Sequence, residues 1–352
     1  MPAPSLGDWA SHSPYSDPAP HTDLLTAIAP EPAAVHAAAC ATVVHYRDQG
    51  LPGGPTPEQW HDIDRRWLSS TLDAATERAP GPLDAPREPA QQVAGCCRDH
   101  TLFSLGVLRS HGVPARSRIG FAGYFEPGFG VDHVVVEHWD GARWVRWDPE
   151  LAPGDEWDFD PYDMPVGVSR NPESDLDQPF VTAAQAWLAI QAGAADPAKF
   201  GVAGVPELSG HGFVRRYVLL EVAHRHRDEL LLWDVWGPGI GAVPDDAPEA
   251  AGKEAAAAAG LAGLDVSPEE FDALADELAH LLVAADVGDD IAAEELAELY
   301  EGDPRLHPGT RVGTYSPSER GGITDLATRT TTWLDLDGAQ AIGRSNYRPA
   351  TS

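Results

Sequence analysis

The chain has 352 residues, of which 43% are hydrophobic, enough to form a substantial core. A single hydrophobic core stops growing at roughly 250–300 residues, so this length predicts two domains or one domain with long extensions. The 55 acidic residues outnumber the 24 basic ones and give a formal net charge of −31. This charge repels phosphate backbones and anionic lipids, which excludes nucleic acid and membrane surfaces as expected partners.

The amino terminus carries no recognisable targeting signal. Residues 1–22 have neither the basic nor the apolar region of a signal peptide, and no apolar run approaches the roughly 18 residues of a membrane span. We therefore expect a cytoplasmic protein. Only Cys40, Cys96 and Cys97 are present, a number and spacing that predict neither a disulfide framework nor a zinc site. We expect no metal and no cofactor, and the oligomeric state is open.

Helices are expected in the first part of the chain, followed by a mixed segment. Apolar spacing predicts helices at 24–29, 33–47 and 57–78, and the proline-rich stretch 79–90 marks a surface connection. A buried helix is predicted from Cys97 to His111, ended by Gly112 and Pro114. Three segments rich in β-branched and aromatic residues then predict strands at 115–124, 133–139 and 143–148. A helix followed by a hairpin of this kind predicts an α+β fold.

The second half of the chain shows weaker patterns. Helical periodicity recurs at 181–193, 212–224, 268–285 and 289–300, an Ala-rich linker is expected at 244–263, and the tail after Pro304 is polar. The predicted organisation has five parts: a flexible lead at 1–22, a catalytic core with N-terminal helices at 23–165, a helical extension at 166–243, the linker and acidic helices at 244–302, and a partly disordered polar tail at 303–352.

Cys97 is the candidate nucleophile. A cysteine attacks a carbonyl as a thiolate, which the N-terminus of a helix and a neighbouring imidazole both favour. Cys97 begins the best-defined predicted helix, where the free backbone N–H groups favour negative charge. A buried cysteine that serves only as a small hydrophobic residue is the competing interpretation.

A hairpin supplies the candidate base and its orienting acid. Asp140-Gly141 is typical of a two-residue type I′ turn, and in the register that this turn sets His133 faces Asp148 directly. The carboxylate would then fix the imidazole tautomer and leave the second ring nitrogen for the thiol. A three-residue loop would instead place Pro149 opposite His133, and a cross-strand polar pair without catalytic role is the competing interpretation.

These residues resemble the transglutaminase-like superfamily. The similarity rests on Gly95-Cys96-Cys97-Arg98-Asp99, Gly112-Val113-Pro114-Ala115-Arg116, Asp132-His133, Trp144 and Asp148-Pro149, within about 93–151, and later segments look similar to stand-alone bacterial members. The resemblance implies a papain-like core, a nucleophile helix packed on an antiparallel sheet, with Cys97, His133 and Asp148 as catalytic residues. It also implies an aromatic oxyanion donor, for which Trp60 and Trp67 are candidates, although their helical spacing favours core packing for both.

The sequence predicts acyl transfer through a Cys97 thioester, on a peptide, protein or small-molecule acyl donor with an amide or thioester group. An amine acceptor would make the protein a transferase, whereas water would make it a cysteine peptidase or amidase. Two further alternatives are a non-catalytic binding module that retains the fold and an amide synthase that uses a carrier-bound acyl thioester.

Overall fold

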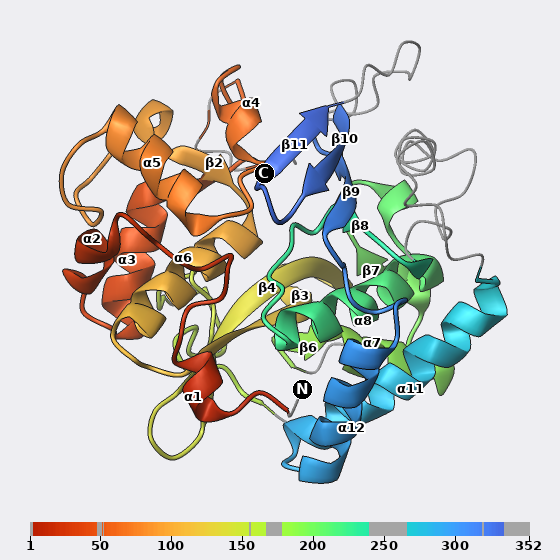
Figure 1. Cartoon of the computed structure of the whole chain (residues 1–352). Helices are drawn as coiled ribbons and strands as arrows, with labels where there is room; N and C mark the ends of the chain where they lie inside the picture. The colour runs from red at the N-terminus through yellow and green to blue at the C-terminus, as the bar shows by residue number, and fades with distance from the viewer. Residues whose placement is uncertain are drawn as a thin grey trace.

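The computed structural model describes residues 3–47, 51, 53–154, 156–166, 178–238, 266–318 and 320–333. Helices pack on sheets that are mainly antiparallel, so the fold is α+β, as the sequence predicts (Figure 1). Within the described residues, no helix is long and apolar enough to cross a membrane.

The centre of the fold is one buried helix packed against a five-stranded sheet. The helix α6 (Cys97–Ser110) has thirteen buried residues among its fourteen. The strands β3 (Ala115–Glu126), β4 (Phe129–Trp139) and β5 (Trp144–Trp147) follow it in an antiparallel arrangement. The short strand β6 (Phe180–Thr182) pairs with β3, and β7 (Phe200–Gly201) pairs in parallel with the start of β4. Apolar residues at alternate positions of β3 and β4 form the core with α6.

The N-terminal segment covers α6 from one side. It forms helices α1 (Leu6–Trp9), α2 (Thr22–Thr26), α3 (Pro32–Thr42), α4 (Gln59–Asp62) and α5 (Leu68–Arg78), the short helix η1 (Pro89–Gln91), and the parallel strands β1 (Val43–His45) and β2 (Val93–Gly95). Residues predicted as a flexible lead are packed rather than free, because Trp9 is buried edge-on against Trp144 at 5.3 Å. The Ser13 hydroxyl also donates to Glu229 at 2.6 Å.

Helices from the second half of the chain cover the other side of the sheet. These are α7 (Ala183–Gln191), α8 (His211–Arg225), α11 (Pro268–Asp286) and α12 (Asp290–Gly302), with the short helices η2 (Pro197–Lys199) and η3 (Pro206–Leu208). A buried ion-pair network fastens α8 and α11 to the sheet. In this network Arg118 pairs with Glu137, Glu221 and Asp286.

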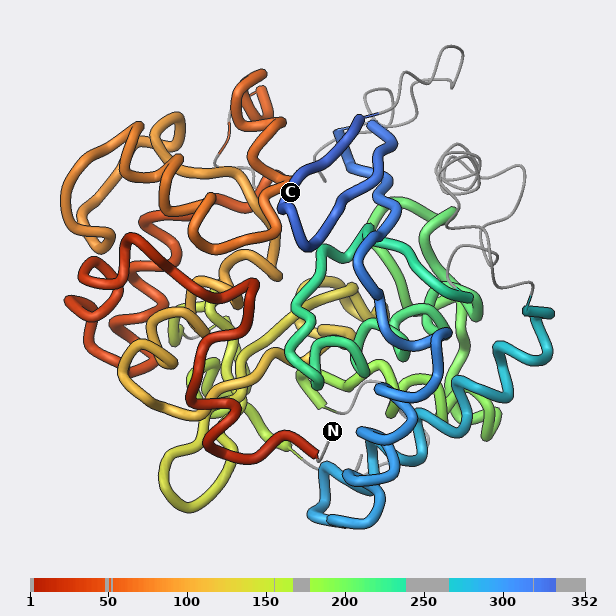
Figure 2. Tube along the Cα trace, viewed as in Figure 1, coloured from red at the N-terminus to blue at the C-terminus, as the bar shows by residue number. Residues whose placement is uncertain are grey.

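A second antiparallel sheet is built by β8 (Asp234–Val235), β9 (Arg311–Ser316), β10 (Arg320–Asp325) and β11 (Thr330–Trp333). Its C-terminal strands lie beside the N-terminal segment that follows α4 (Figure 2). Ser316 donates to Asp64 at 2.8 Å, and the guanidinium of Arg66 bonds both oxygens of Asp234 at 2.6 and 2.9 Å. The first and last parts of the chain are therefore joined by buried polar contacts.

Several sequence predictions need correction. The helix predicted at 57–78 is broken, because residues 63–67 separate α4 from α5, and the helix predicted at 33–47 ends at Thr42, where a strand begins. The polar tail carries three strands that periodicity missed. The linker predicted at 244–263 lies outside the described residues.

Candidate active site

Cys97 is the first residue of α6, as predicted. The turn before it is held by Asp99, whose carboxylate accepts the backbone N–H of Cys96 at 2.8 Å. One helical turn after Cys97, on the same face of the helix, the Thr101 hydroxyl donates to the carbonyl of Val134 at 2.9 Å. Because Val134 follows His133 in β4, this bond holds the start of α6 beside the strand segment that carries the candidate base.

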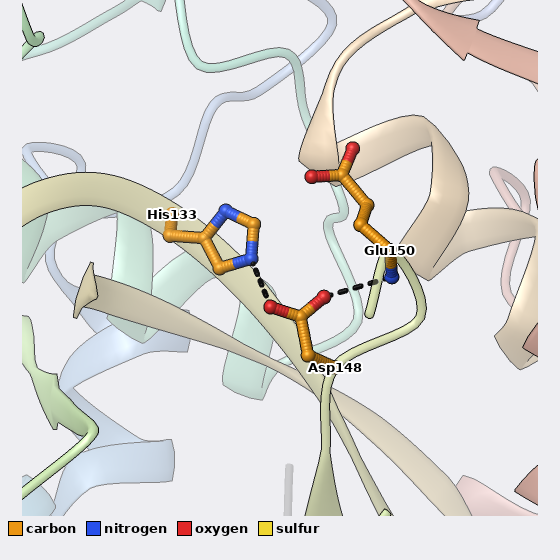
Figure 3. Close-up of side chains that lie close together, drawn as sticks. All are labelled: His133, Asp148 and Glu150. Carbon is orange, nitrogen blue, oxygen red and sulfur yellow. Dashed lines mark hydrogen bonds and ion pairs between the residues drawn. The ribbon is translucent and has the colours of Figure 1, made fainter. Parts of the chain in front are cut away.

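His133 and Asp148 form a buried pair. Nε2 of His133 lies 2.7 Å from Oδ2 of Asp148, and both side chains are almost fully removed from solvent (Figure 3). The acceptor is a carboxylate oxygen, so Nε2 carries the proton in this bond. Nδ1 lies on the other side of the ring, away from Asp148 (Figure 3). The pair therefore fixes the tautomer that leaves Nδ1 free to accept a proton.

The predicted strand register behind this pair is wrong by two residues. The loop between β4 and β5 has four residues, because Trp139 pairs with Trp144. The Asp140 carboxylate accepts the backbone N–H groups of Ala142 and Arg143, both at 2.8 Å, and this local bonding replaces the predicted two-residue turn. The register continued by one residue would place Asp148 opposite Val135. His133 is then a diagonal neighbour on the same face, about 7–8 Å away in the backbone and within reach of a side chain.

Tyr124 is a further member of the site that the sequence analysis missed. Its hydroxyl donates to the same Oδ2 atom of Asp148 at 2.5 Å, and its ring stands edge-on to His133 at 6.2 Å. The pairing between β3 and β4 shifts between Ala122 and Glu126, so Tyr124 lies in an irregular stretch whose register no alternation rule predicts.

Glu150 also faces the site. Its backbone N–H donates to Oδ1 of Asp148 at 2.8 Å, and its carboxylate lies 2.8 Å from Nδ1 of His100 in α6. The other ring nitrogen of His100 lies 3.1 Å from the carbonyl of Val43. Both ring nitrogens of His100 thus face hydrogen-bond acceptors, which favours the imidazolium. Burial alone would lower the pKa of His100, but Glu150 outweighs burial and the pKa is raised well above its ordinary value.

The electrostatic environment of Cys97 disfavours the thiolate that the sequence predicts. Contact with the Cys96 thiol and burial raise the pKa of Cys97 well above its usual value, and the charges of Glu150 and Asp132 raise it further. Burial alone would lower the pKa of His133, but Asp148 and Glu150 outweigh it and the net pKa is raised. These shifts disfavour both the thiolate of Cys97 and the loss of a proton from the imidazolium of His133. Within the part of the chain that the structure describes, no hydrogen bond joins the Cys97 thiol to His133.

Trp60, the candidate oxyanion donor, lies in α4 and is half-buried. Its ring packs near Tyr46 at 6.2 Å and against the small apolar cluster around Val44 and Ile63. Its described contacts are with this cluster, and none of them is with Cys97. The structure thus brings His133 and Asp148 into contact and gives Trp60 a packing role.

Among the residues that the structure describes, His133, Asp148 and Glu150 could hold a metal ion, since one donor atom from each lies within 4.8 Å of the others. Hydrogen bonds already described occupy part of this donor set. Nε2 of His133 is bonded to Asp148, and both oxygens of Asp148 accept hydrogen bonds. A cation bound by Nε2 and Asp148 would have to break those bonds, so the geometry fits an acid–base pair better than a metal centre.

Comparison with known proteins agrees with the motif analysis. Residues 61–149 match the family model of the transglutaminase-like superfamily. No curated protein matches the chain. A similar solved structure is "The Crystal Structure of a Putative Cysteine Protease from Cytophaga hutchinsonii", with 18% sequence identity, 40% coverage of each chain and a TM-score of 0.27. The residues that match the transglutaminase-like family model include Cys97, His133 and Asp148.

Proposed function

We propose that this transglutaminase-like domain is a cysteine-dependent acyltransferase or amide hydrolase. In this mechanism Cys97 attacks the carbonyl of an amide or thioester and forms a thioester, and the leaving amine or thiol departs with a proton. His133 accepts the thiol proton and returns it to the leaving group, and Asp148 orients the imidazole. The substrate would be a peptide, a protein or a small-molecule acyl donor.

The observation that supports this proposal is the buried pair of His133 and Asp148 beside the start of α6. A histidine whose Nε2–H is held at 2.7 Å by a carboxylate, with Nδ1 free, has the tautomer that a general base requires. The hydrogen bond from Thr101 to Val134 brings the helix that begins at Cys97 to the same strand. A purely structural ion pair would not need the adjacent helix to begin with a cysteine.

The raised pKa of Cys97 affects how the proton moves. Because the Cys96 thiol and burial hold the pKa of Cys97 above its usual value, the proposed mechanism has His133 remove the proton as the sulfur attacks, rather than start from a preformed thiolate. Nδ1 of His133 has to be unprotonated for this step. The N–H groups at the N-terminus of α6 are suited to stabilise the negative charge that develops on the carbonyl oxygen.

The nature of the acceptor separates the alternatives. An amine that attacks the Cys97 thioester forms a new amide, whereas water makes the protein a cysteine peptidase or amidase. A carrier-bound donor would make it an amide synthase. If Cys97 forms no acyl-enzyme at all, the protein is a binding module that retains the fold.

An activated ester tests the proposal without knowledge of the natural donor. The protein is mixed with 4-nitrophenyl acetate, the release of nitrophenolate is followed, and the acetylated cysteine is located by mass spectrometry. We expect acetyl transfer to Cys97 that depends on His133 and is lost in His133→Ala. The matched control is His138→Ala, which removes a half-buried histidine from the same strand. Absence of acetyl-Cys97, or equal acetylation in both variants, would contradict the proposal.

A further inference from the structure

Among the residues that the structure describes, Tyr124 is the one side chain besides His133 that bonds the carboxylate of Asp148. Oδ2 of Asp148 accepts two hydrogen bonds, from the Tyr124 hydroxyl and from Nε2 of His133, and Oδ1 accepts the backbone N–H of Glu150. Asp148 is fully buried, so it has no water to replace any of these donors. Each donor therefore affects how strongly the carboxylate attracts the others.

The Tyr124 hydroxyl is suited to act as a permanent hydrogen-bond donor to Asp148. Burial, then the charge of Asp148, raise the pKa of Tyr124 well above its ordinary value, so the hydroxyl keeps its proton and remains a donor. Its ring packs on Phe159 at 5.2 Å and on Trp157 at 5.9 Å, which fixes the direction of the hydroxyl. The donor is thus held in place by contacts that do not involve His133.

We propose that Tyr124 is a positioning residue for the acyl-transfer reaction: its hydroxyl holds the Asp148 carboxylate in line with His133 and, by sharing Oδ2, limits how tightly Asp148 holds the protonated imidazole. The inference rests on the proposed function, because it assigns Tyr124 a part in the same proton transfer. If Asp148 stabilises the imidazolium of His133 too strongly, His133 stays protonated near neutral pH and cannot accept the thiol proton. The hydrogen bond from Tyr124 takes up part of the negative charge of Oδ2 and so keeps His133 usable.

The substitution Tyr124→Phe leaves the other titratable groups around His133 unchanged. Those that face it are Asp148, Glu150, Asp132, His45 and Tyr124 itself. Replacing Tyr124 by phenylalanine removes one hydroxyl and leaves the four others and the aromatic packing in place. A change in the titration of His133 would therefore report the lost hydrogen bond.

The test compares wild type with Tyr124→Phe by NMR titration of selectively labelled histidines, with the His133 signal assigned from His133→Gln. We expect the pKa of His133 to rise by about one unit in Tyr124→Phe, a tenfold increase in proton affinity. The acidic limb of the pH profile for Cys97 acetylation should move to higher pH by the same amount. Tyr162→Phe, which removes the hydroxyl of a half-buried tyrosine without a bond to Asp148, should change neither.

A double variant tests whether Tyr124 acts through Asp148. In an Asp148→Asn background the further change Tyr124→Phe should no longer shift His133. An unchanged His133 pKa in the single variant, or the same shift with and without the Asp148 carboxylate, overturns the inference even if Cys97 is acetylated normally. Failure of wild-type Cys97 to react, with a normal shift of His133 in Tyr124→Phe, instead refutes the proposed function and leaves Tyr124 without a reaction to serve.

Discussion

The substitution Glu137→Gln tests the buried network that fastens the outer helices to the central sheet. Glu137 lies in the middle of β4, where its carboxylate contacts Arg116 and Arg146 at 2.8 Å and Arg118 at 3.5 Å. Burial alone would raise its pKa, but the three guanidinium groups outweigh burial and lower the pKa to about 2. Glutamine keeps the size of the side chain and removes its charge.

The size of the effect follows from that pKa. The folded pKa of about 2 lies below the ordinary value of 4.5, so ionised Glu137 stabilises the folded state above pH 4.5 and loses this effect as the pH falls toward 2. At 1.36 kcal/mol per unit, the shift corresponds to about 3 kcal/mol at pH 7, similar to the loss from breaking a buried ion pair. About 1.4 kcal/mol of it should disappear between pH 6 and pH 3.5.

Urea unfolding of wild type and Glu137→Gln, followed by circular dichroism at several pH values, measures this directly. We expect a difference in the free energy of unfolding of about 3 kcal/mol at pH 7 that narrows below pH 4.5. Glu126→Gln, an exposed glutamate on the neighbouring strand, is the matched control and should change the stability little. A difference below about 1 kcal/mol at neutral pH, or one that does not depend on pH, would refute the argument.

Two further predictions concern the reactive helix and the cysteines. Thr101→Val removes the donor to the Val134 carbonyl, so we expect a loss of about 1–3 kcal/mol in the free energy of unfolding and slower acetylation of Cys97; urea titration and nitrophenolate release measure these, and unchanged values contradict the role of this bond. Burial raises the pKa of Cys40, but the imidazoles of His100 and His36 outweigh burial and lower the pKa to about 7. Iodoacetamide at pH 7 should therefore label half-buried Cys40 before Cys97, whose pKa is raised. Mass spectrometry of the labelled peptides decides the order.

The core of the fold follows from short-range patterns in the sequence. The helix from Cys97 is predicted to within one residue of its observed end, because its apolar positions recur at helical spacing and Gly112 follows in a left-handed conformation. The strands β3, β4 and β5 are predicted because their segments are rich in β-branched and aromatic residues. The strands β9 and β10 are missed because each mixes arginine and glycine with few large apolar residues, and β11 is only four residues long. Their sheet depends on pairing of β8 with β9, β9 with β10 and β10 with β11.

The site is only partly predictable for a physical reason. Contact between His133 and Asp148 tolerates the error in register, because a diagonal pair on one sheet face is still within reach of the aromatic His133 side chain. The contacts of Tyr124, Glu150 and His100 depend on an irregular hairpin and on the loop after β5, neither of which has a periodic pattern. The pKa of Cys97 is raised first by the adjacent Cys96 thiol and then by burial and by the acidic groups Glu150 and Asp132, which long-range packing brings near it. The predicted helix N-terminus alone suggests a shift in the opposite direction.

The pH dependence of acyl transfer distinguishes two kinds of cysteine chemistry. An enzyme with a preformed thiolate and imidazolium reacts well below the pKa of a free thiol. Here Asp148 and Glu150 raise the pKa of His133 above 6.5, despite burial, and the Cys96 thiol and burial raise the pKa of Cys97, which disfavours a preformed thiolate. Because the imidazole must lose its proton before it can act as a base, acetylation of Cys97 should rise with pH, with a midpoint above 6.5.

Asp148→Asn should shift the pH profile of acetylation in the direction opposite to Tyr124→Phe, because it removes the carboxylate that raises the pKa of His133. Without the carboxylate, burial dominates the titration of His133, so its pKa should fall and the acidic limb of the rate profile should move to lower pH. The maximum rate should fall as well, because the asparagine can present its amide group to Nε2 and no longer selects one tautomer. A wild-type midpoint at or below 6.5, or a limb that moves upward in Asp148→Asn, would mean that Cys97 reacts from a preformed ion pair and that the carboxylate does not control the base.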